Sequence, residues 1–179
     1  MSAAGFRLLP LSIAAVITTG CASFSSTPAL SDDPCADLQS IVADYPNRYA
    51  DLRGSRSDFN TVTLYRAKKD IVKGHCEIWE WAGGDTAYVC SLNAPNNEIA
   101  EHRYEQTVEY VGGCLGDNWQ PEIANRTRDG EDAGVVTRYR NPDAGDLVIS
   151  VHNVSVSGTG RAARSNYVFI GTAGRSSQL

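Results

Sequence analysis

The cysteines of this chain limit the folds that it can adopt. Besides Cys21 there are four, Cys35, Cys76, Cys90 and Cys114. Their spacings of 41, 14 and 24 residues provide no C-x-x-C half-site for zinc, so we predict no metal site and no cofactor. An even number of cysteines is typical of disulfides in an exported domain, and four cysteines allow three pairings.

A predicted β-hairpin favours one of the three disulfide pairings. HCEIWEW (residues 75–81) and residues 86–92 are predicted to be strands and are joined by the turn sequence AGGD, as expected for two antiparallel strands. A register centred on Gly83 places Cys76 opposite Cys90 and permits a disulfide between them. A register shifted by half a step would misalign the two cysteines, so the pairing stays open at this point.

Two helices are predicted from apolar residues that recur at three- and four-residue steps. The first covers residues 34–45, and the second covers residues 96–111 and ends or frays at Gly112-Gly113. Cys35 and Cys114 fall on the apolar faces of these helices. If Cys76 pairs with Cys90, the remaining disulfide therefore ties the helices together.

The fold class follows from the order of the predicted elements. Period-two segments predict six strands, at residues 59–66, 75–81, 86–92, 135–140, 147–156 and 166–171. The order is helix, three strands, helix, three strands, and the connections are short enough for antiparallel neighbours. We therefore predict an α+β domain, an antiparallel sheet with two helices packed on one face.

The alternation also divides HCEIWEW into two faces. Cys76, Ile78 and Glu80 share one face, and His75, Glu77, Trp79 and Trp81 share the other. In one interpretation Trp79 and Trp81 form the core under the helices, and the disulfide seals a thinner opposite face. In the other, these tryptophans are an exposed aromatic platform that binds a partner, because tryptophan is enriched at interface hot spots.

The N-terminus predicts export. Arg7 precedes an apolar run, residues 8–17, which small residues follow up to Cys21. The 13 residues between Arg7 and Cys21 are fewer than the roughly 20 that a transmembrane helix needs. Residues 1–20 therefore match a signal peptide rather than a membrane span.

The sequence Thr18-Thr19-Gly20-Cys21 resembles the lipobox of bacterial lipoproteins, although Thr18 stands where that family commonly has Leu. The resemblance implies cleavage before Cys21, which would carry a thioether-linked diacylglycerol and an acyl chain such as palmitate. Two or three buried acyl chains attach a protein stably to a membrane. Ala22, in place of the Asp that retains lipoproteins in the inner membrane, implies an outer-membrane anchor with the domain facing the periplasm.

The rest of the chain is predicted to form one domain. Residues 21–33, the lipidated N-terminus and a flexible tether, are rich in Ser and Thr and have few large apolar side chains. Residues 34–172 suit a single core, and residues 173–179 are predicted to be a flexible tail. Loss of Arg7 leaves 15 of 16 basic residues against 21 acidic ones, which changes the net charge from −5 to −6. Nucleic acid is therefore not expected as a partner.

No catalytic signature is present. The three histidines, His75, His102 and His152, fall in separate predicted elements, and neither G-x-S-x-G nor H-E-x-x-H occurs. We therefore predict a non-enzymatic, membrane-anchored module that binds an envelope protein or glycan. Two alternatives remain open: an inhibitor or immunity-type lipoprotein, and an envelope hydrolase whose pocket gathers His75 or His152 with acidic residues.

Overall fold

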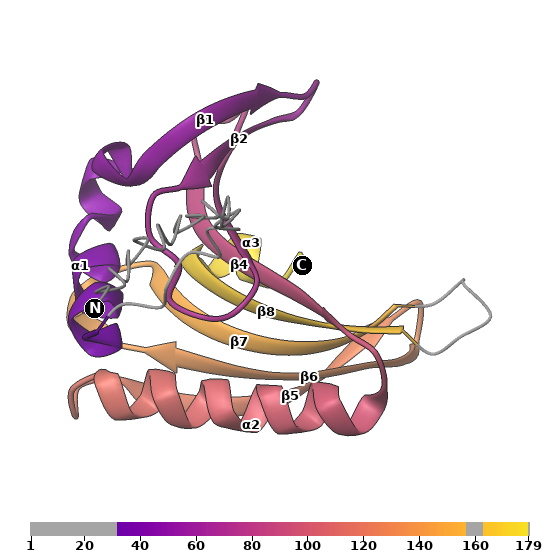
Figure 1. The fold of residues 1–179 in the computed structure, drawn as a ribbon. Coiled ribbons are helices and arrows are strands. Elements are labelled where there is room, and N and C mark those ends of the chain that lie inside the picture. Colours follow the sequence, from indigo (N-terminus) through magenta and orange to yellow (C-terminus); the bar gives the residue numbers. More distant parts are fainter. Residues whose placement is uncertain (1–31, 157–162, 179) are drawn as a thin grey trace, which may run out of the picture.

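The structure is a computed structural model that describes residues 32–156 and 163–178. The predicted signal peptide, the lipidation site Cys21 and nearly all of the tether lie outside these residues. Figure 1 shows a curved sheet with the long helix α2 along one side and α1 at one end.

Three α-helices, eight strands and three short 3-10 helices make up the described part of the chain. The 3-10 helices are η1 (Tyr45–Asn47), η2 (Ala50–Leu52) and η3 (Pro142–Ala144). The α-helices are α1 (Pro34–Ala43), α2 (Asn97–Cys114) and the short α3 (Ala173–Ser176). The strands of the first half are β1 (Arg53–Asp58), β2 (Val62–Ala67), β3 (His75–Trp81) and β4 (Thr86–Ala94). Those of the second half are β5 (Gln120–Arg128), β6 (Glu131–Arg140), β7 (Leu147–Val156) and β8 (Ala163–Thr172).

The strands form one antiparallel sheet in the order β1-β2-β3-β4-β8-β7-β6-β5. Each half of the chain is a helix followed by a four-stranded meander. The two meanders meet in the middle of the sheet, where β4 pairs with β8. Strands β1 and β5 are therefore the outer edges.

The predicted layout of helix, three strands, helix, three strands is wrong, because each helix is followed by four strands. The two missed strands are the edge strands β1 and β5, whose residues are mostly exposed. An edge strand is fixed by backbone hydrogen bonds to one neighbour and buries little, so it lacks the alternating apolar pattern from which inner strands are predicted.

Local signals fix where the two long helices begin. Asp33 caps α1 by accepting a hydrogen bond from the backbone of Ala36 at 2.9 Å, and Pro34 occupies the first turn. Asn96 caps α2 through the backbone N–H of Ile99 at 2.8 Å. The predicted end of the second helix at Gly112-Gly113 is wrong, since α2 continues to Cys114, which a disulfide links to Cys35 of α1.

The main core lies between the helices and one face of the sheet. Leu38 and Ile41 of α1 and Val111 of α2 pack there against buried strand residues that include Ile78. On β3 it is thus Cys76 and Ile78 that face the helices. The interpretation that placed Trp79 and Trp81 under the helices is wrong: both lie on the opposite face, with a smaller apolar cluster that includes Phe169.

Two disulfides connect these parts. Cys76 pairs with Cys90 across β3 and β4, in the register centred on Gly83, and Cys35 pairs with Cys114 between α1 and α2. The segment predicted as a flexible tail contains α3, in which Ser176 is buried. Within the described residues, no helix combines the length and apolar character needed to cross a membrane.

Candidate ligand-binding site

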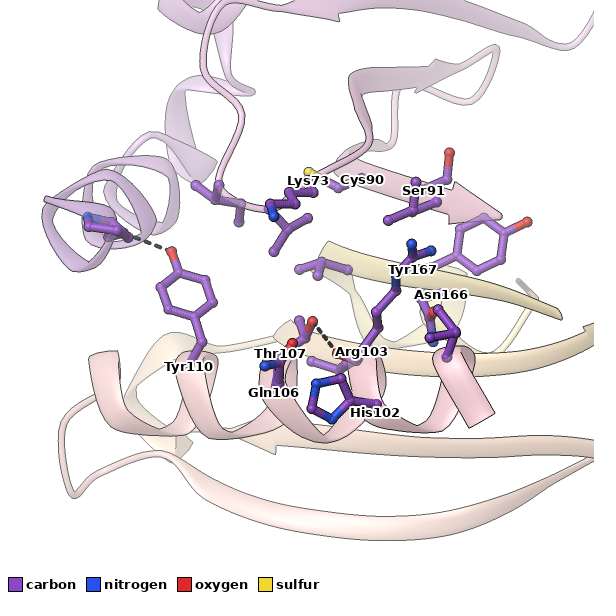
Figure 2. Close-up of a pocket in the computed structure, with 17 residues that line it drawn as sticks. Lys73, Cys90, Ser91, His102, Arg103, Gln106, Thr107, Tyr110, Asn166 and Tyr167 are labelled. Atoms are coloured by element: carbon purple, nitrogen blue, oxygen red, sulfur yellow. Dashed lines mark hydrogen bonds between the residues drawn. The ribbon is translucent and has the colours of Figure 1, made fainter. Parts of the chain in front are cut away.

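A cavity of about 460 Å³ lies between α2 and the sheet, under the connection from β2 to β3 (Figure 2). Its floor is apolar and comes from three strands: Cys90 on β4, Val151 on β7 and Val168 on β8. Ile71 and Val72 of the connection also line it. The volume falls within the roughly 300–1,000 Å³ that is usual for small-molecule sites.

Two long side chains bridge the space between α2 and the opposite wall (Figure 2). The Tyr110 hydroxyl donates a hydrogen bond to the carbonyl oxygen of Pro34 at 2.7 Å. Burial, followed by the charges of Asp37 and Asp33, raises the pKa of Tyr110 to about 12, so the hydroxyl keeps its proton. Arg103 donates from Nη1 to the carbonyl oxygen of Asn93 at 3.1 Å. These two contacts link α2 to the first helix and to β4 on either side of the cavity.

The connection that forms the upper wall is held in place by its own contacts. The Tyr88 hydroxyl donates to the carbonyl oxygen of Lys69 at 2.7 Å. Lys69 forms an ion pair of 2.6 Å with Asp37 of α1, and Asp70 forms one of 2.5 Å with Arg66 of β2. These contacts to β2, β4 and α1 hold the connection apart from α2. The cavity between them is therefore largely pre-formed.

One end of the cavity carries an unpaired hydrogen-bond acceptor. Asn166 on β8 is 8% exposed and lines the cavity, and its Nδ2 donates to the carbonyl oxygen of Ala100 at 3.0 Å. Its Oδ1 has no hydrogen-bond partner among the described residues. The same holds for the Oδ1 of its buried neighbour Asn153, opposite it on β7. A buried acceptor left unpaired costs about 1–3 kcal/mol, so this end favours a group that donates a hydrogen bond.

The charged side chains that line the cavity have one sign. Lys73 and Arg103 line it, and no Asp or Glu is among the described residues that do so. The chain as a whole has 21 acidic and 16 basic residues, so this is a local reversal of its charge. The exposed Lys73 forms no ion pair within the described part of the chain.

The predicted partner-binding residues Trp79 and Trp81 lie on the face of the sheet away from this cavity. Both are half-buried, and their rings meet edge to face with centroids 5.9 Å apart. The indole N–H of Trp79 donates to Glu77 at 3.1 Å, and the guanidinium of Arg175 covers Trp81 at 4.6 Å. The two rings are thus already engaged by their own chain, and their role in binding a partner stays a prediction.

The histidines do not assemble into one site. His75 is exposed and pairs with Glu77 at 2.9 Å, whereas His102 lies on α2 at the cavity. His152 is fully buried on the other face of the sheet. Because the three histidines lie in different parts of the fold, they do not form one catalytic centre.

His152 is part of a buried hydrogen-bonded chain. Arg126 donates from Nη1 to its Nδ1 at 2.6 Å, which assigns the ring proton to Nε2, and Nε2 donates to the Ser150 hydroxyl at 2.8 Å. Ser150 in turn contacts the Ser176 hydroxyl at 2.8 Å. Burial, followed by the charges of Arg126 and Arg138, lowers the pKa of His152 to about 3. A histidine bonded to arginine rather than to a carboxylate is poorly suited to act as a general base.

Comparisons of the chain with protein-family models, with curated proteins and with solved structures found no match. The candidate site therefore rests on the geometry of the chain itself.

Sequence reasoning missed this cavity because its walls come from segments far apart in the chain. Helix α2, the β2–β3 connection and three strands contribute to it. The helical period does place Arg103 and Tyr110 about two turns apart on α2, and Asn166 is an amide at the start of the predicted strand at residues 166–171. Only the pairing of β4 with β8 brings these residues together.

Proposed function

We propose that this chain is a non-enzymatic binding module of the cell envelope that holds a small, largely apolar molecule between α2 and the sheet. The observation that carries the proposal is the cavity with its apolar floor. An apolar pocket with few polar groups is the usual form of a small-molecule site.

The location is part of the same proposal. A lipidated Cys21 anchors the module in the outer membrane, and residues 22–33 tether it on the periplasmic side. The two disulfides support this because such bonds form and persist in oxidising compartments. Mass spectrometry of the protein from membranes tests it: we expect an acylated Cys21 as the first residue. A chain that starts elsewhere and lacks acyl groups would contradict the anchor.

Binding is tested by filling the cavity. Ile99 of α2 lines it and is half-buried, so Ile99→Trp places an indole where a ligand would lie. The probe is phenylnaphthylamine, a neutral apolar dye that fluoresces when it leaves water. The protein is the mature chain with Cys21→Ser. This variant carries no acyl chains that could compete with the dye for the cavity. We expect Ile99→Trp to weaken dye binding at least tenfold.

The matched control is Glu109→Trp, which adds the same side chain to the exposed face of the same helix. It should bind the dye like the parent protein, and circular dichroism should show that both variants melt in one transition. Equal dye affinity in Ile99→Trp and Glu109→Trp would refute the cavity as the binding site.

A further inference from the structure

The charge of the cavity wall indicates the chemistry of its ligand. Among the described residues that line the cavity, the charged side chains are Lys73 and Arg103, and both are basic. The protein as a whole has more acidic than basic residues. Three acidic residues of α2 do not line the cavity but border an adjoining hollow: Glu98, Glu101 and Glu105. This hollow shares Ile99 and His102 with the cavity. Charges of one sign around a low-dielectric cavity attract ligands of the other sign and repel their own.

Resting on the function proposed above, we infer that the ligand is an anionic amphiphile: an apolar chain that ends in a carboxylate or a phosphate. The chain lies over Val151, Val168 and Leu92, and the anionic end lies at Lys73 and Arg103. A single chain fits a volume of about 460 Å³, which is in the lower half of the usual range for ligand sites.

Lys73 and Arg103 have donors free for such a group. Lys73 is exposed at the rim, and its ammonium is bound to no carboxylate in the described segments. A guanidinium has five N–H donors, and the bond to Asn93 uses one donor of Arg103. Figure 2 shows Lys73 on the upper wall and Arg103 rising from α2 toward Ser91 and Tyr167. The two cations thus lie on opposite walls of the cavity, and each has donors free for an anion.

A cationic or neutral amphiphile fits less well. A cation at the rim would meet two like charges, and a neutral hydroxyl would gain no charge-assisted hydrogen bond. The apolar floor is the same for all chains of equal length. Head-group charge alone should thus separate their affinities.

The test compares four amphiphiles with the same chain, each below its critical micelle concentration: dodecanoate, dodecyl phosphate, dodecanol and dodecyltrimethylammonium. Displacement of phenylnaphthylamine from the mature chain with Cys21→Ser gives the four affinities. We expect dodecanoate, dodecyl phosphate or both to bind at least ten times more tightly than dodecanol, and the cation to bind most weakly. The tighter of the two anions tells whether a fatty acid or a phosphate-bearing lipid is the closer model.

The variant that carries the test is Lys73→Glu, and its matched control is Lys68→Glu. Both residues are exposed lysines of the same connection, but Lys68 does not line the cavity and instead donates to the carbonyl oxygen of Asp51. Lys73→Glu should lower affinity for the anions about tenfold and leave dodecanol unchanged. Lys68→Glu, with the same change in net charge, should leave the affinities for the anions and for dodecanol unchanged.

The outcomes separate this inference from the proposed function. If dodecanol binds as tightly as the anions and Lys73→Glu changes nothing, the cavity binds apolar chains and the anionic head group is refuted. If none of the four displaces the dye, or Ile99→Trp binds it like the parent, the proposed function fails as well.

Discussion

His152 shows how burial sets the behaviour of a single residue. Its sequence position, a histidine on a strand, is compatible with catalysis, with metal binding or with a plain core residue. In the fold it is enclosed and accepts a hydrogen bond from a cation, Arg126, and its pKa falls from 6.5 to about 3. A neutral, fully buried imidazole acts here as a structural link between Arg126 and Ser150.

This pKa predicts a pH dependence of stability. The unfolded chain protonates His152 near pH 6.5, but the folded chain does so only near pH 3, so the unfolded state binds more protons in between. The contribution of His152 is therefore fully present above about pH 6.5 and declines as the pH falls toward 3, by up to about 1.4 kcal/mol per pH unit. Urea unfolding at several pH values between 4 and 7 measures this slope.

The variant His152→Gln should be less stable at pH 7, because it breaks a buried hydrogen-bonded chain, and should lose less stability on acidification. His75→Gln is the control, since His75 is exposed. An unchanged slope in His152→Gln would mean that its protonation is not coupled to folding.

At the scale of the elements, Gly134 and Gly113 differ in backbone conformation and in the space around them. Gly134 on β6 has φ of +111°, and a Cβ there would collide with the carbonyl oxygen of Asn153 on β7. Gly113 lies near the end of α2 and has open space around it. The same substitution should therefore have opposite effects at the two sites.

We expect Gly134→Ala to lower the free energy of unfolding by about 2 kcal/mol or more, because strained backbone and a clash between strands add together. Gly113→Ala should raise it by about 0.4–1 kcal/mol, since alanine restricts the unfolded chain and favours a helix. Chemical denaturation of both variants measures the two changes. Equal effects would show that β6 adapts to a side chain at residue 134.

Inner and edge strands also differed in how well the sequence predicted them. The strand at His75–Trp81 was predicted to the residue, since it is rich in large apolar residues, is followed by a turn sequence and sits inside the sheet. The sequence RGSRSD of β1 offers no apolar face, and its strand forms only because β2 supplies a backbone partner. Pairing of this kind depends on the rest of the sheet, so local sequence does not show it.

At the scale of the whole molecule, the disulfides differ in what they join. Cys76–Cys90 links two strands that already pair, across a separation of 14 residues. Cys35–Cys114 spans 79 residues and ties α1 to the end of α2. In the chain-entropy model, loops of these lengths correspond to about 3 and about 4.5 kcal/mol of stabilisation.

We therefore predict that Cys35→Ser with Cys114→Ser destabilises the protein more than Cys76→Ser with Cys90→Ser, by roughly 1–2 kcal/mol. Removal of Cys35–Cys114 should also weaken dye binding, since Pro34, which accepts the bond from Tyr110, borders the cavity beside it. Urea unfolding and dye titration of the two double variants measure both effects. A larger loss from the hairpin pair would contradict the loop-length argument.

The sequence by itself determined the helix starts and the inner strands of this protein. Caps at Asp33 and Asn96 began the helices, and the turn centred on Gly83 permitted the register that sets Cys76 opposite Cys90, which the structure adopts. These features depend on residues within a few positions of one another, so local stereochemistry is enough to specify them.

The tertiary structure alone decided which face of the sheet the helices cover and what lies between them. Both faces of β3 carry large apolar side chains, so its sequence allowed Trp79 or Ile78 to face the core. The choice came from the long-range pairing of β4 with β8 and from packing of α2 across β7 and β8. The same packing gathers Lys73, Arg103 and Asn166 around one cavity, because the position of α2 over the sheet depends on contacts summed over the whole domain.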